Sequence, residues 1–72
     1  MQSQQSEAQE SDLPPQISKP AWRALTGAGY WRLDQVAQAS AADLLRLHGM
    51  GPKALGILRA ALAARGLSLA GE

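Results

Sequence analysis

The residues best suited to chemistry lie in one short segment, 47–55, which reads Leu-His-Gly-Met-Gly-Pro-Lys-Ala-Leu. Two glycines flank one apolar residue, and a proline and a lysine follow directly, a pattern that predicts the end of one helix and the start of the next. The first turn of a helix offers unpaired N–H groups and the positive end of the helix dipole. Glycine also lets an anion approach the backbone closely. The segment therefore predicts a site for an anionic group such as a phosphate.

Backbone N–H groups are the expected donors of this site. Pro52 has no N–H, so the donors are expected among Gly49, Met50, Gly51, Lys53 and Ala54. The Lys53 ammonium adds a mobile positive charge, and the Met50 side chain is expected to point into the core. The plainer alternative is that the two glycines only form a tight turn between two helices.

The sequence offers no catalytic constellation. It contains a single histidine, His48, and no cysteine. In the part of the chain that we expect to fold, leaving aside the last residue, the two acidic residues nearest to each other in the sequence are Asp34 and Asp43. No spacing typical of metal ligands is present. We therefore expect no enzymatic activity, no metal and no cofactor, and we expect His48 to be an exposed or capping residue.

The composition predicts that only helices position these residues. Of the hydrophobic residues, 14 are alanine and 11 are leucine, with one valine, two isoleucines and no phenylalanine. Alanine and leucine favour helices, whereas strands favour β-branched and aromatic residues. The fold class expected is therefore all-α, a compact bundle of four to five short helices.

Capping signals and apolar spacing divide the chain into these helices. A first short helix is expected to begin near Pro20 and to end at the glycines 27 and 29, and a second to cover 33–37. Ser40 followed by Asp43 approximates a capping box and opens a third helix, through residue 47. The fourth and longest helix is expected to begin at Pro52 and to end at Gly66. The side chains expected in the core are Leu25, Leu33, Val36, Leu44, Leu47, Met50, Leu55, Leu58 and Leu62. The two tryptophans, 22 and 31, are expected to be packing residues.

Charge and composition change along the chain. Residues 1–16 hold three acidic residues and no basic one, whereas residues 17–72 hold all seven basic residues against three acidic ones. Residues 1–12 are polar and are expected to be disordered, and the prolines 14 and 15 indicate an extended linker. The expected organisation is a disordered acidic tail and proline linker over 1–16 and a basic helical domain over 17–72. A basic domain favours an anionic partner.

The segment 47–55 resembles the helix-hairpin-helix motif of nucleic-acid-binding proteins, in which a hydrophobic residue, two glycines around another hydrophobic residue, a lysine and an alanine recur. The likeness extends over about residues 13–71 to the C-terminal domain of the bacterial RNA polymerase alpha subunit, most clearly in Arg65-Gly66-Leu67-Ser68-Leu69. The resemblance implies a compact helical domain that contacts the backbone and minor groove of DNA and also docks regulators. The large assembly domain of that subunit has no counterpart in this sequence.

The resemblance carries over position by position. The glycine and lysine of the family's hairpin correspond to Gly51 and Lys53, and the small hydroxyl residue that follows corresponds to Ala54. The arginine with which the family reads the minor groove corresponds to Pro20, and its asparagine partner corresponds to Arg23. Lys19 or Arg23 is expected to supply the positive charge that Pro20 lacks, and Arg46 is the nearest further cation.

Two functions follow as expectations. The first is a DNA-binding module that holds the duplex phosphate backbone through Gly49, Met50, Gly51, Lys53, Ala54, Lys19, Arg23 and Arg46, with little sequence specificity. The second is a module of the same scaffold that docks a protein partner. No uninterrupted apolar run approaches the roughly 18 residues of a membrane-spanning helix, so a cytoplasmic protein without a membrane or small-molecule partner is expected.

Overall fold

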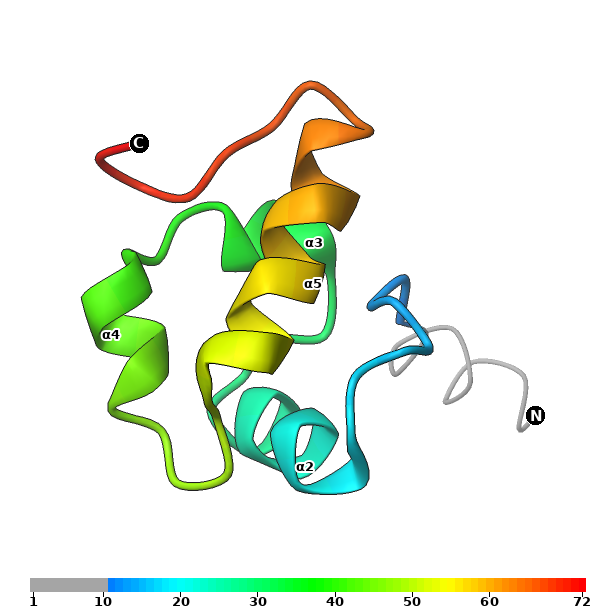
Figure 1. Ribbon diagram of the computed structural model, residues 1–72, viewed down its shortest axis with the longest axis vertical. Coiled ribbons are helices and arrows are strands. Elements are labelled where there is room, and N and C mark those ends of the chain that lie inside the picture. The colour runs from blue at the N-terminus through cyan, green and yellow to red at the C-terminus, as the bar shows by residue number, and fades with distance from the viewer. Residues whose placement is uncertain (1–10) are drawn as a thin grey trace, which may run out of the picture.

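The protein folds as a small all-helical domain (Figure 1). The computed structural model describes residues 11–72, and within this range it contains four helices and no strand. The helices are α2 (Lys19–Gly27), α3 (Leu33–Val36), α4 (Ala41–Leu45) and α5 (Pro52–Ala63). The all-α fold class and the four helices are thus confirmed. The expectation of disorder over residues 1–10 lies outside the described residues.

The helices begin where the sequence places capping residues. The hydroxyl of Ser18 accepts a hydrogen bond from the backbone N–H of Ala21, at 3.3 Å, and so caps α2. The hydroxyl of Ser40 does the same for the N–H of Asp43, at 3.1 Å, and caps α4. The last helix, α5, begins at Pro52 without a side-chain cap, since Gly51 precedes it.

Helix α5 supplies four buried residues to the core, more than any other helix, and packs against α3 and α4. Seven of the nine predicted core residues are buried, while Leu47 and Met50 are half-buried and pack against the core. Their position in the α4–α5 hairpin, at the edge of the bundle, leaves these two partly open to solvent. The core contains five further buried residues: Leu13, Ala21, Ala39, Ala54 and Leu69.

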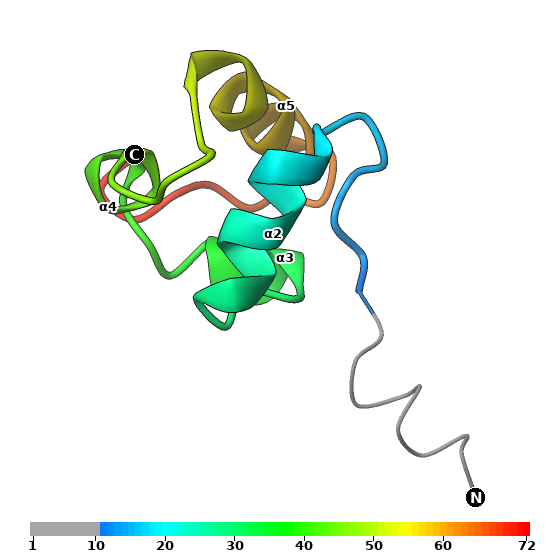
Figure 2. The same cartoon turned by 90° about the horizontal axis from the view of Figure 1, so that it is seen from below.

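The segment before α2 differs from the expected free linker. Figure 2 shows it, in blue, running along one side of the helices to the start of α2. The Leu13 side chain is 8% exposed and belongs to the core. One carboxylate oxygen of Asp12 accepts a hydrogen bond from the N–H of Leu33, the first residue of α3, at 2.7 Å. The other lies 2.7 Å from the Arg65 guanidinium. The packed part of the chain therefore includes residues 12 and 13, because these contacts fix them to both α3 and the end of α5.

The chain after α5 folds back over the bundle (Figure 1). Gly66 has a φ of +74°, and the next N–H, that of Leu67, donates to the carbonyl of Leu62 at 2.8 Å, which closes the helix. Leu69 is 1% exposed, whereas Leu67 stays 38% exposed. Between residues 11 and 72, no helix has the length and apolar character needed to cross a membrane.

Candidate nucleic-acid interface

The hairpin between α4 and α5 packs against the start of α2. Gly49 has a φ of +102°, a conformation that favours glycine. A Cβ at Gly49 would lie 2.6 Å from the carbonyl oxygen of Pro20 and 3.5 Å from the Cβ of Ala24. Gly51 is different, because its backbone is extended, with a φ of −155°, and a Cβ there would meet no atom within 4 Å. The first glycine therefore lets the hairpin touch α2, and the second leaves open space at the start of α5.

The backbone N–H groups of the hairpin are mostly unengaged. Those of Gly49, Gly51, Lys53 and Ala54 donate to no other residue within 11–72. Met50 differs, because its N–H donates to the carbonyl of Leu47 at 3.0 Å and its side chain packs against the core, as predicted. Four of the five predicted donors thus have no acceptor among the described residues, and Met50 serves the turn itself.

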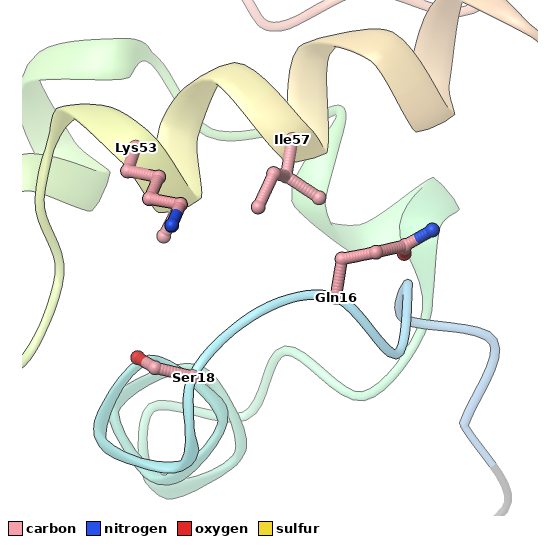
Figure 3. Close-up of a pocket in the computed structure, with 5 residues that line it drawn as sticks. Gln16, Ser18, Lys53 and Ile57 are labelled. Atoms are coloured by element: carbon pink, nitrogen blue, oxygen red, sulfur yellow. The ribbon is translucent and has the colours of Figure 1, made fainter.

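Lys53 faces the start of α2 across a small pocket of about 120 Å³. Figure 3 shows its side chain on one wall and Ser18 on the other, with Gln16 and Ile57 further along the opening. Ala54 also lines this pocket, although its side chain is only 8% exposed. The start of α5 and the start of α2 are therefore brought together, and the Lys53 ammonium lies between them. No pattern in the sequence indicates this juxtaposition.

A second pocket, which is shallow, lies between α2 and the hairpin. It is lined by residues of both: Pro20, Arg23, Ala24, His48 and Gly49. Arg23 and His48 are both exposed, as expected for His48. Lys19 lies four residues before Arg23 in α2 and is also exposed, so the two cations share one face of the helix. The predicted candidates on α2 thus adjoin the hairpin in space.

Most of the other charges of the domain are neutralised in pairs. Arg32 lies 3.6 Å from Asp34, and Arg46 lies 3.7 Å from Asp43. Arg65 is paired with Asp12, as described above, and the Nε of Arg59 donates to the Glu72 carboxylate at 3.1 Å. The four pairs use every carboxylate side chain within residues 11–72. Arg46, expected to be part of the site, therefore carries a counter-charge of its own.

Three cations remain without a carboxylate partner among the described residues: Lys19, Arg23 and Lys53. We call these three the cationic surface. With seven basic and four acidic side chains in residues 11–72, the domain has an excess of three positive charges. This excess equals the number of unpaired cations, and all three lie around the starts of α2 and α5.

No group of three histidine, aspartate or glutamate side chains within residues 11–72 lies close enough to hold a metal ion. Comparisons of the chain with models of protein families, with curated proteins and with solved structures found no match. The geometry of the cationic surface and the hairpin is therefore what bears on function.

Proposed function

We propose that this domain binds duplex DNA through the phosphate backbone, with little sequence specificity. The observation that carries the proposal is the segregation of charge within residues 11–72. Arg23 and Lys53 adjoin the hairpin, Lys19 lies one turn from Arg23 on α2, and these three have no described carboxylate partner, while the other four cations are paired with carboxylates. Cations that neutralise phosphates supply most of the affinity in non-specific DNA binding. The resemblance of segment 47–55 to the helix-hairpin-helix motif supports the same function.

In the proposed binding, the hairpin and the cations of α2 contact different phosphates. One phosphate is held at the start of α5, by the N–H groups of Gly51, Lys53 and Ala54, which have no acceptor among the described residues, and by the Lys53 ammonium. Lys19 and Arg23, one turn apart on α2, contact neighbouring phosphates. Such contacts fix the position of the domain on the duplex but carry no sequence information.

The dependence of affinity on salt tests this proposal directly. If three phosphates are neutralised, the logarithm of the association constant falls against the logarithm of the salt concentration with a slope of about −2.7. Micromolar or weaker affinity is expected, because one small module makes few contacts. A slope near zero with duplex DNA contradicts the proposal.

A pair of variants tests the segregation of charge. Lys53→Ala is expected to weaken binding equally for different sequences and to reduce the salt slope by about one unit. Arg32→Gln is the matched control, since it removes one positive charge as well but from a cation already paired with Asp34. An equal loss in both variants means that only the net charge matters, and the cationic surface is then not the binding site.

Gly51→Val tests the hairpin itself. On the sequence alone, valine at this position strains the turn if the φ of Gly51 is positive, but the observed φ is −155°, which valine adopts readily. The variant is therefore expected to fold and to bind DNA more weakly, because its side chain obstructs the approach of a phosphate to the N–H groups of α5. Unchanged binding by the folded variant shows that the hairpin is only a turn.

The alternative function, docking of a protein partner, is favoured by one feature. Beside α2 lies an open, mostly apolar groove of about 400 Å³, lined by Leu13, Pro14, Pro15, Ile17, Lys19 and Trp22. We call it the Trp22 groove. Chemical shifts of the backbone amides separate the two functions, since DNA binding moves the signals of 49–54 in a salt-dependent way, whereas docking moves those of 13–22 alone.

A further inference from the structure

We propose that the Trp22 groove receives an unpaired nucleobase, so that the domain prefers nucleic acid with a single-stranded part. The inference rests on the proposed function, because it requires that the phosphates of the same strand lie on the cationic surface. The inference adds a second binding site beside the cationic surface, and the ligand of this second site is a nucleobase. The groove lies beside the hairpin site and uses different residues, apart from the neighbouring cations of α2.

The lining of the groove matches the chemistry of a base. Its walls are the apolar side chains of Leu13, Ile17 and Trp22 together with two prolines. Trp22 is half-buried, and its ring meets that of Trp31 edge to face, with the centroids 5.7 Å apart. A half-buried aromatic ring in an apolar pocket gives a base a stacking partner whatever its sequence.

The charges at the groove match the rest of a nucleotide. Lys19 lines the groove and has no carboxylate partner within residues 11–72, and Arg23 follows one turn further along the exposed face of α2. No described carboxylate lines the groove. A base in the groove therefore has cations beside it for the phosphates attached to its sugar, the combination of stacking and charge with which proteins hold single strands.

The size of the groove suits a single base. All six lining residues belong to the single stretch 13–22, and the volume, about 400 Å³, falls in the range of small-ligand pockets. An acidic apolar peptide is the competing occupant, and it enters the test below.

The test compares two ligands with the same phosphates. A short single-stranded oligothymidine and an abasic strand of equal length are titrated into the protein, with binding followed by fluorescence anisotropy of a label on the strand. The proposal predicts binding at least fivefold tighter for the base-bearing strand, since stacking of one base has roughly that effect. This comparison needs no variant, so it does not depend on the stability of one.

A pair of variants then assigns the difference to the groove. Trp22→Leu is expected to abolish the advantage of the base-bearing strand and to keep the binding of the abasic strand. Trp31→Leu is the matched control, because it removes the other ring of the pair, which does not line the groove. Thermal unfolding of both variants shows whether they fold, and the advantage must persist in folded Trp31→Leu.

The outcomes separate the inference from the proposed function. Equal, salt-dependent binding of the two strands overturns the nucleobase site while the proposed backbone binding stands. Absence of binding to either strand and to duplex DNA overturns both. A peptide rich in leucine and glutamate that shifts the amides of 13–22, in a protein that does not distinguish the two strands, also overturns the inference and assigns the groove to a protein partner.

Discussion

Gly49 lies against Pro20 so closely that a Cβ on the glycine would be 2.6 Å from the carbonyl oxygen of the proline. The contact joins the α4–α5 hairpin to the second residue of α2, residues that are far apart in the sequence. Because the neighbour is backbone and not the end of a flexible side chain, it cannot move aside without displacing α2. The relative position of the hairpin and the cations of α2 thus depends on one glycine.

The two glycines of the hairpin are therefore expected to respond differently to alanine. Gly49→Ala combines a positive φ with the clash, and we expect it to lower the free energy of unfolding by at least about 2 kcal/mol. Gly51→Ala is expected to change it by less than about 1 kcal/mol, because reduced chain entropy opposes the weaker preference for alanine at the N-cap. Urea unfolding of both variants checks this, and equal effects contradict it.

Asp12 is expected to stabilise the domain through its two contacts. Asp12→Ala removes both the acceptor of the Leu33 N–H and the partner of Arg65, and should cost about 1–2 kcal/mol of unfolding free energy. Asp12→Asn keeps an oxygen for the N–H and loses only the exposed ion pair, so its cost should stay below about 1 kcal/mol. Chemical denaturation measures both. If the two variants are as stable as the parent, the packing of this segment contributes nothing.

Glu72 is expected to give the stability a dependence on acid pH. The hydrogen bonds from Arg59, helped by its charge, hold the pKa of the Glu72 carboxyl below its ordinary value. A carboxyl whose pKa is lowered by folding contributes stability that is complete above its unfolded pKa and is lost as the pH falls through the folded pKa. The melting temperature of Glu72→Gln should therefore lie below that of the parent at neutral pH, and the gap should close below about pH 4. A constant gap contradicts this origin.

The sequence predicts the helices and most of the core because those depend on local signals. Pro20, Ser40 and Pro52 mark helix starts that the structure places within a residue or two of the expected positions. The burial of Leu13 was not predictable in this way. It stands between polar residues and prolines and has no periodic neighbours, so only the tertiary contacts of the segment reveal it.

The residues of the candidate site were predictable from the sequence, but which of its cations form ion pairs was not. Sequence analysis selected Lys19, Arg23 and Lys53 and added Arg46 as the nearest further cation. Whether a cation is paired depends on distances between side chains, and only the structure shows Arg46 beside Asp43.

Arg46 provides the last prediction, because its counter-charge can be removed. Asp43→Asn should release Arg46, which lies at the end of α4 just before the hairpin, and so add a fourth unpaired cation near the proposed DNA site. The amide retains the size of the side chain, and the Asp43 backbone N–H still donates to Ser40, so the helix cap is kept. We expect tighter binding to duplex DNA and a salt slope steeper by up to about 0.9.

The matched control is Glu72→Gln, which raises the net charge by the same amount but releases Arg59, seven residues into α5 from Pro52. Seven residues of helix span about 10 Å, roughly one Debye length at 0.1 M salt, so the charge of Arg59 should add much less to the affinity. Binding isotherms at several salt concentrations compare the two variants. If both strengthen binding alike, affinity follows the total charge of the domain, and the position of Arg46 beside the hairpin has no part in it.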